Sequence, residues 1–255
     1  MTTRFLLARA AAAACALLAV TACGPSSTRL GPPDSALPTG AAGQLVLQGR
    51  ALAKNSAPLL GERGGNGLHC ASCHLDAGAA TNAGAWVRLP ASDDAALAAR
   101  INRCLVESMN GQPLAADAPS MKALLAYIGW LGTPAPKDAP EPAGARGFGA
   151  VDAALKPDAV HGAALYTDRC AHCHGDQGEG TRRKASEGGG FKYPPLWGEQ
   201  AFGAASEMTQ LPIAAAFVKN NMPRTRSHPL SAQEAVDVSA YFIAQPRPAA
   251  TASGS

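Results

Sequence analysis

The pattern Cys-x-x-Cys-His occurs twice in this chain, from Cys70 to His74 and from Cys170 to His174. In such a motif two thiols one helical turn apart can form thioethers to the two vinyl groups of a haem, and the adjacent histidine then lies beneath the iron. A thioredoxin-like dithiol or half of a zinc site would need a βαβ unit or further cysteine pairs. The repeat therefore predicts two covalently bound haem c groups, with thioethers at Cys70, Cys73, Cys170 and Cys173.

Two such motifs in 255 residues predict two domains of roughly 90 to 110 residues each. Around each motif the sequence shows a leading helix with a glycine, Gly49 or Gly162, and a final apolar helix that ends in aromatic residues. This order resembles the class I cytochrome c fold, in which that glycine lets the last helix cross closely. We expect a mainly α protein with two tandem class I cytochrome c-like domains, each with one haem.

Composition shifts along the chain predict where the domains begin and end, because stretches rich in Gly, Pro, Ser and Ala are typical of tethers and linkers. The expected organisation is a signal peptide over 1–22, a flexible tether over 23–43, a first domain over 44–132, a linker over 133–150, a second domain over 151–246 and a disordered tail over 247–255.

The N-terminus has the features of an export signal. Arg4 is followed by an apolar run from Phe5 to Val20 that is too short for a comfortable membrane span. The sequence from Val20 to Cys23 resembles a bacterial lipobox, which predicts a lipid anchor at Cys23; the alternative is ordinary cleavage near Ala22. Both interpretations place the mature protein in the periplasm.

The net charge and the assignment of the cysteines limit the functions that the sequence allows. A formal net charge of +3 is too small to indicate nucleic-acid binding, and no nucleic-acid-reading motif is present. Of the seven cysteines, Cys15 leaves with the signal, Cys23 is the lipid candidate and four belong to the haem motifs. Only Cys104 is left without a role.

The histidines of the two motifs, His74 and His174, are the expected proximal iron ligands. For the second haem, Met222 precedes Pro223 on a loop ahead of the final helix, and a thioether ligand there would raise the reduction potential. The alternatives are Met208 or His228 as ligand, or a five-coordinate iron.

For the first haem, the residues alone leave Cys104 and Met109 as equal candidates. A helix is expected from Ser92 to Met109, and steps of four residues align Arg100, Cys104 and Ser108 along one edge of it. If that edge faces the haem, the metal and the guanidinium would both favour a Cys104 thiolate, which should lower the potential.

Several stretches resemble the dihaem thiosulfate dehydrogenase family. The run from Arg100 to Gly111 is Arg-Ile-Asn-Arg-Cys-Leu-Val-Glu-Ser-Met-Asn-Gly, and the runs 193–198 and 216–223 in the second domain agree as well. The resemblance implies His74 and Cys104 at the first iron, and His174 and Met222 at the second. It also implies oxidative joining of two thiosulfates to tetrathionate, with Arg100 and Ser108 holding the anion.

The functional hypothesis is an exported enzyme that oxidises thiosulfate, or a related sulfur oxyanion, with Cys104, Arg100 and Ser108 as catalytic residues. Its electrons would leave through the second haem to a soluble cytochrome or another periplasmic acceptor. Arg103 or Arg88 could assist Arg100 with the dianions. The alternative is a dihaem electron carrier without chemistry of its own, which the short segment between Trp86 and Arg100 favours.

Overall fold

The fold comes from a computed structural model, which describes residues 29–60, 65–87, 93–132, 144–145, 147–225 and 228–249. The expected signal peptide and the lipid-anchor candidate Cys23 lie outside these residues, as do Arg88 and most of the linker. Among the residues that are described, no helix is both long and apolar enough to cross a membrane.

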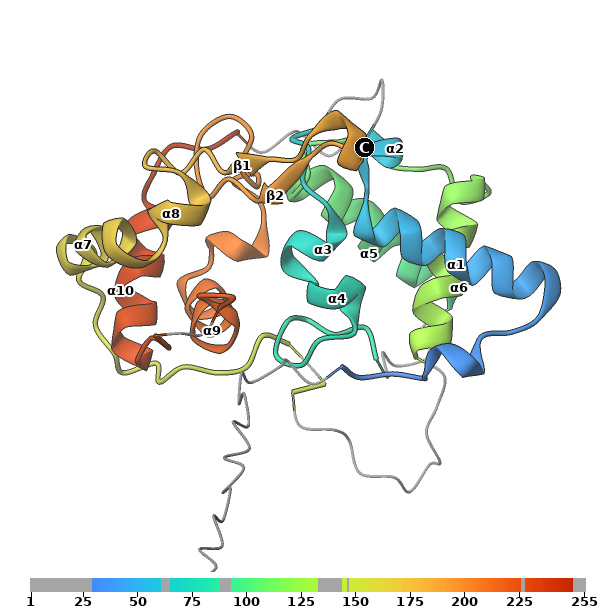
Figure 1. Cartoon of the computed structure of the whole chain (residues 1–255), viewed down its shortest axis with the longest axis horizontal. Helices are drawn as coiled ribbons and strands as arrows, with labels where there is room; N and C mark the ends of the chain where they lie inside the picture. Colours follow the sequence, from blue (N-terminus) through green and yellow to red (C-terminus); the bar gives the residue numbers. More distant parts are fainter. Residues whose placement is uncertain are drawn as a thin grey trace, which may run out of the picture.

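The chain forms two helical units that lie side by side, the first drawn in blue to green and the second in yellow to red (Figure 1). The helices of the first unit are η1 (Asp34–Ala36), α1 (Gly40–Lys54), α2 (Ala57–Leu60), α3 (Cys70–Cys73), α4 (Leu75–Gly78), α5 (Asp94–Glu107) and α6 (Pro119–Leu131). Those of the second are α7 (Ala159–Arg169), α8 (Ala171–His174), η2 (Ala185–Glu187), η3 (Glu207–Thr209), α9 (Leu211–Asn221) and α10 (Ala232–Ile243). The expectation of two tandem, mainly helical cytochrome c-like domains is confirmed.

A close crossing of the first and last helix organises each unit. A Cβ atom added to Gly49 on α1 would lie 1.9 Å from the carbonyl oxygen of Ala123 on α6. A Cβ added to Gly162 on α7 would lie 2.1 Å from the carbonyl oxygen of Asp237 on α10. Only glycine fits at either point, which is the role predicted for these two residues.

Aromatic rings pack beside both crossings, as the sequence predicts. Tyr127 on α6 stacks against Trp130 at 6.1 Å between ring centroids, and its hydroxyl donates to the carbonyl oxygen of Ala77 at 3.0 Å. In the second unit, Tyr166 and Tyr241 lie 5.6 Å apart. Because Ala77 follows the first haem motif closely, the Tyr127 hydrogen bond fixes that motif against the final helix.

The helix that carries the candidate site begins where its capping residues predict. Asp93 is the N-cap of α5, and its Oδ1 accepts a hydrogen bond from the Ala96 amide at 2.6 Å. The helix ends at Glu107, with Ser108 as its C-cap. Side chains four residues apart on α5 therefore share a face, as the alignment of Arg100, Cys104 and Ser108 requires.

The expected tether over 23–43 is wrong from Arg29 onward. The Leu30 amide donates to the carbonyl oxygen of Ala79 at 2.6 Å, and the Leu30 side chain is buried. Asp34 pairs with Arg50 of α1 at 2.8 Å, and α1 already begins at Gly40. The Gly- and Pro-rich composition obscured this packing, which depends on one buried leucine and on ion pairs with distant residues.

The expected start of the disordered tail, at residue 247, is too early. The Arg247 guanidinium lies 4.4 Å from the centre of the Phe202 ring and donates to the carbonyl oxygen of Phe242 at 2.7 Å. The Ala204 amide donates to the carbonyl oxygen of Pro248 at 3.0 Å. The second domain therefore extends at least to Pro248.

The end of the expected linker packs against the first domain. The Gly84 amide donates to the carbonyl oxygen of Gly147 at 2.7 Å, the Asn82 amide donates to that of Gly144 at 2.8 Å, and Ala145 is buried.

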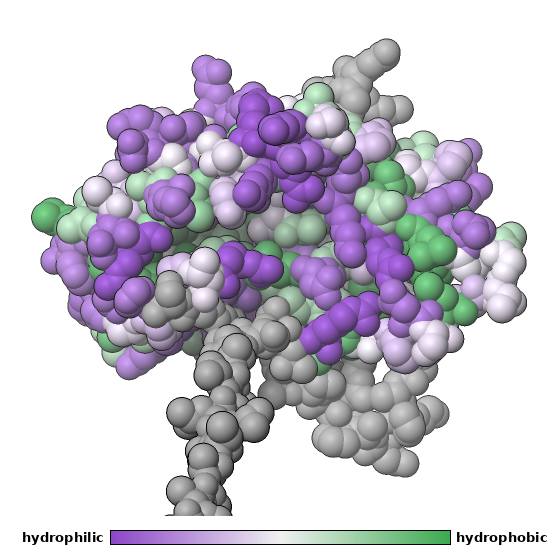
Figure 2. All heavy atoms as spheres, in the orientation of Figure 1, coloured by the Kyte–Doolittle hydropathy of each residue, from purple (hydrophilic) through white to green (hydrophobic). Residues whose placement is uncertain are grey.

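Beyond the linker, the second domain contains an antiparallel pair of short strands, β1 (Thr181–Arg182) and β2 (Phe191–Tyr193), which the sequence pattern did not predict. In the space-filling view hydrophilic residues cover much of this face of the molecule (Figure 2).

Replacing Gly49 with alanine should destabilise the protein by about 3 kcal/mol or more, because the new methyl group would overlap the backbone of α6. Gly129→Ala on α6 is the matched control: nothing lies within 4 Å of its Cβ position. That control should be neutral or stabilise by about 0.5–1 kcal/mol through helix propensity. Denaturant unfolding of the two holoproteins measures the difference, and equal stability would contradict the close crossing.

Candidate functional site

A cavity of about 390 Å³ lies between the first haem motif and α5. Its wall combines the motif residues Cys70, Cys73 and His74 with apolar side chains of the first domain. α5 and the residues after its C-terminal end contribute charged, polar and sulfur-containing side chains, namely Arg100, Arg103, Cys104, Glu107, Ser108 and Met109. Ser206, Glu207 and Met208 of the second domain complete the wall.

Both motif histidines are held in one orientation by a backbone carbonyl. His74 Nδ1 lies 2.7 Å from the carbonyl oxygen of Gly84, and His174 Nδ1 lies 2.8 Å from that of Pro194. Burial lowers the pKa of both imidazoles. A neutral ring that donates from Nδ1 leaves the Nε2 lone pair free for a metal, so both histidines fit the role of proximal ligand.

The first motif presents two partly buried thiols next to this imidazole. Cys70 and Cys73 bracket the single turn α3, and the Ser56 hydroxyl donates to Cys70 Sγ at 3.4 Å. Burial raises the pKa of the Cys73 thiol to about 12. Two thiols one turn apart, an oriented imidazole and a largely apolar cavity fit a covalently attached haem.

The second motif repeats this arrangement on α8. Cys170 is its N-cap, and burial raises the pKa of that thiol to about 11. Met222 is the C-cap of α9 and packs, partly buried, against the hydrophobic core. Nowhere in the described ranges do three or more His, Cys, Asp or Glu side chains form a cluster suited to a bare metal ion. The donors thus fit haem attachment at both motifs.

On α5 and the turn that follows it, the structure brings both candidate distal ligands of the first haem to the cavity. Cys104 and Met109 line it together, and Met109 is the more buried of the two. Burial raises the pKa of the Cys104 thiol, while a hydrogen bond from Ser108 opposes that rise. The guanidinium of Arg100 acts instead on His74, whose pKa its charge lowers. A bound iron would be a further charge that favours a Cys104 thiolate.

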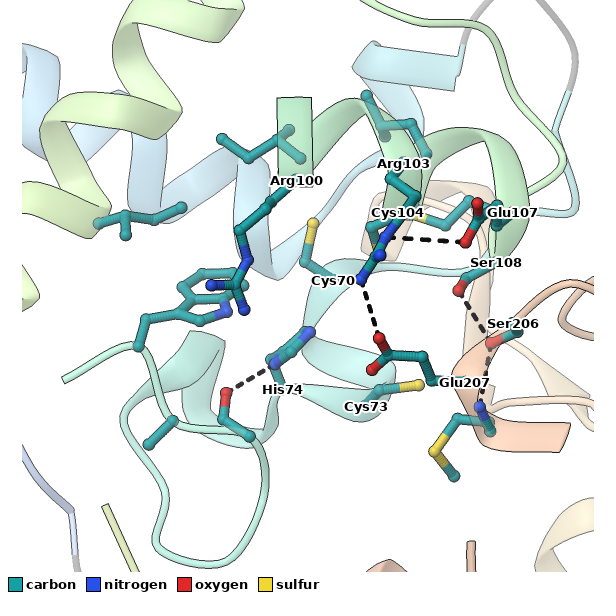
Figure 3. A pocket seen from close by; sticks show the side chains of 18 of the residues that line it. Cys70, Cys73, His74, Arg100, Arg103, Cys104, Glu107, Ser108, Ser206 and Glu207 are labelled. Carbon is teal, nitrogen blue, oxygen red and sulfur yellow. Dashed lines mark hydrogen bonds and ion pairs between the residues drawn. The ribbon is translucent and has the colours of Figure 1, made fainter. Parts of the chain in front are cut away.

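The three residues predicted to act together, Arg100, Cys104 and Ser108, all line the cavity (Figure 3). The Arg100 side chain extends from α5 toward His74. Within the described part of the chain, no carboxylate forms an ion pair with Arg100. Arg103, by contrast, pairs with Glu207 at 2.8 Å and more loosely with Glu107 at 3.8 Å.

No sequence pattern indicated that the second domain contributes to the first cavity. Ser206 Oγ lies 2.9 Å from Ser108 Oγ, and Glu207 reaches Arg103 across the same boundary. Met208, considered as an alternative ligand of the second haem, lines the first cavity instead. These residues follow a loop with no recognisable motif, so their role depends on how the two domains pack.

A buried asparagine holds the two domains in this arrangement. Asn66 donates from Nδ2 to the carbonyl oxygens of Ser108 and Ala201, at 2.9 and 2.8 Å. On the other side of the haem motif, Asn221 donates to the carbonyl oxygen of Asn82 at 2.7 Å. The position next to Met222 is therefore fixed to the first domain.

An aromatic ring from the linker also connects the two domains. Phe148 lies 6.2 Å from the His74 ring and 5.8 Å from Phe217 on α9, measured between ring centroids. The proximal side of the first site is thus in packing contact with the helix that ends at Met222.

Comparison with known proteins agrees with this arrangement. Residues 61–133 match the SoxA/TsdA cytochrome c domain, and residues 159–243 match the cytochrome c domain. The chain is 37% identical to the thiosulfate dehydrogenase of Stutzerimonas stutzeri, over 85% of this chain and 72% of that protein. It is 35% identical to the thiosulfate dehydrogenase of Allochromatium vinosum, over 85% of this chain and 83% of that one.

A solved structure is similar as well, the thiosulfate dehydrogenase TsdBA from Marichromatium purpuratum in its as-isolated form. The match has a TM-score of 0.75 at 35% identity and covers 88% of this chain and 50% of that one. The chain thus spans half the length of the TsdBA chain.

Two cytochrome c domains, each with a haem-attachment motif and an oriented histidine, make this chain a dihaem c-type cytochrome. Within that class it belongs to the thiosulfate dehydrogenase family.

Replacing Asn66 with alanine should lower the free energy of unfolding by about 2 kcal/mol, because it removes the partner of two carbonyl groups at the domain boundary. Asn55→Ala removes an exposed contact across the same boundary, to the Gly188 carbonyl oxygen, and a local one from the Ala57 amide; it is the control and should cost less than about 1 kcal/mol. Chemical unfolding followed by circular dichroism compares them. Similar losses in both variants would show that Asn66 is not a main link between the domains.

Proposed function

We propose that this protein oxidises thiosulfate to tetrathionate in the cavity beside His74 and passes the electrons through its second domain to an external acceptor, such as a soluble cytochrome. The observation that carries the proposal is the position of Arg100. Its guanidinium lines the haem-side cavity together with Cys104 and Ser108, and the described carboxylates leave it unpaired. Membership of the thiosulfate dehydrogenase family supports the same reaction.

The reaction needs an anion site and an outlet for electrons. Joining two thiosulfates forms one sulfur–sulfur bond and releases two electrons, with no proton taken up or lost. When bound, the two haem groups would supply two one-electron acceptors.

The chain's own residues meet the electrostatic requirement of the reaction. Two dianions repel each other, and a guanidinium that forms charge-assisted hydrogen bonds to oxyanions reduces that repulsion. Arg100 supplies this charge, and the Ser108 hydroxyl at the end of α5 supplies a neutral donor. The apolar part of the wall excludes water and strengthens both interactions.

For the iron ligands we propose His74 with Cys104 in the first domain, and His174 with Met222 in the second. The family resemblance favours Cys104 over Met109, and the cavity geometry is compatible with it. The single Ser108 hydroxyl proton would then be donated either to the anion or to the Cys104 sulfur, so that anion binding and thiolate stabilisation share one donor.

We also propose export to the periplasm with a lipid anchor at Cys23. The support is the basic and apolar N-terminal run and the lipobox-like residues before Cys23. Attachment of haem to both Cys-x-x-Cys-His motifs fits that compartment.

Thiosulfate should reduce the purified holoprotein, and tetrathionate should appear in a ratio of one per two electrons accepted. Arg100→Gln should raise KM for thiosulfate about tenfold, equivalent to about 1.4 kcal/mol, by removing a charge-assisted contact. Arg169→Gln, whose guanidinium pairs with Asp168 on the far helix α7, is the matched control and should leave KM unchanged. A protein that accepts electrons from other donors but not from thiosulfate would be an electron carrier instead.

Low-temperature electron paramagnetic resonance tests the ligands. The wild type should show one His/thiolate and one His/Met low-spin haem, and Cys104→Ala should remove only the thiolate signal, because sulfur ligation determines that spectrum. Met109→Leu, a volume-conserving change in the same cavity wall, should leave both signals intact. Two His/Met spectra in the wild type would exclude Cys104 as the ligand.

A further inference from the structure

The second domain supplies a charged residue to the first cavity. Glu207 begins the short helix η3, and Ser206, its N-cap, accepts a hydrogen bond from the Met208 amide at 3.3 Å. The helix contains only three residues, and the turn is positioned by its contacts with the first domain rather than by its own length.

The contacts with the first domain restrict the position of the turn that carries η3. The Gly203 amide donates to the carbonyl oxygen of Ser108 at 3.3 Å, and a Cβ on Gly203 would lie 2.4 Å from the carbonyl oxygen of Glu107. Ser206 Oγ meets Ser108 Oγ at 2.9 Å. Close backbone packing thus holds the carboxylate of Glu207 at the wall of the cavity.

At that wall the carboxylate meets a guanidinium. Glu207 Oε1 lies 2.8 Å from Arg103 Nη2, and both side chains are slightly more than half exposed. Glu107, one turn along α5, is a weaker partner of Arg103 at 3.8 Å. Figure 3 shows the Arg103 guanidinium between these two carboxylates, while Arg100 points toward His74. The cavity therefore contains one arginine available to an anion and one that is already paired.

We propose that Glu207 is a specificity-determining residue that limits the affinity of the first cavity for oxyanions. Its carboxylate acts as an internal anion on Arg103, so that a sulfur oxyanion entering the cavity has to compete for that guanidinium and approach a fixed negative charge. This inference rests on the proposed function, because it concerns the same substrate site. It assigns the second domain a role in substrate affinity in addition to electron transfer.

Neutralising the carboxylate should therefore strengthen anion binding. Glu207→Gln keeps the size and hydrogen-bonding shape of the side chain but leaves Arg103 with only its weaker carboxylate partner, Glu107. We expect Kd and KM for thiosulfate to fall about three- to tenfold, with kcat changed less than twofold. Glu207→Asp, which keeps the charge, should stay close to the wild type.

Two comparisons separate this effect from a general change in charge. Glu187→Gln removes an exposed carboxylate of the second domain, in η2, and should leave Kd unchanged. Measured against Arg103→Met alone, Glu207→Gln should give a smaller gain than in the wild type, because only the repulsion by the carboxylate is then relieved.

The measurement is calorimetric titration of thiosulfate into holoprotein that has been reduced photochemically, so that binding occurs without turnover, alongside steady-state kinetics with the oxidised protein. If thiosulfate binds the wild type and Glu207→Gln equally, the role of Glu207 is refuted while the proposed function stands. If the gain is equally large in the Arg103→Met background, competition for that guanidinium is refuted. Absence of both binding and turnover in the wild type would overturn the proposed function, and this inference with it.

Discussion

The structure depends on a close crossing of two helices, repeated in each domain. At Gly49 and at Gly162 the backbone of the first helix touches that of the last, which leaves no room for a side chain. The crossing holds the haem motif against the final helix, and the Tyr127 hydroxyl then fixes the segment after the motif. The orientation of His74 and the position of α5 depend on this frame, so the chemistry at the first site depends on two glycines far from it.

The second constraint is the boundary between the domains. Asn66 satisfies two carbonyl groups, one from each domain, and thereby places the turn that carries Ser206 and Glu207 at the first cavity. Near Met222, Asn221 connects the domains again, and Phe148 packs between His74 and Phe217. The two domains are therefore more than tandem copies on a linker, because the second domain contributes residues to the cavity at the first haem motif.

The two arginines that α5 contributes to the first cavity differ in their ion pairs among the described residues. Of the two arginines on α5, Arg103 is paired and Arg100 is not, although the two lie three residues apart on the same helix. The difference comes from partners on other segments, since Glu207 belongs to the second domain. Cys104 likewise gains its character from its surroundings: burial opposes its ionisation, Ser108 favours it, and iron would decide the balance.

The sequence by itself determined the haem motifs with their adjacent histidines, the two glycine crossings and the helix that presents Arg100, Cys104 and Ser108, because each depends on local spacing. Only the tertiary structure decided what surrounds them. It showed Leu30 buried where composition indicated a tether, Arg247 fixed where it indicated a tail, and Met208 in the wall of the first cavity. These features depend on contacts between residues up to a hundred or more positions apart. No local pattern encodes such contacts, which is why the wall formed by Ser206 and Glu207 could not be read from the chain alone.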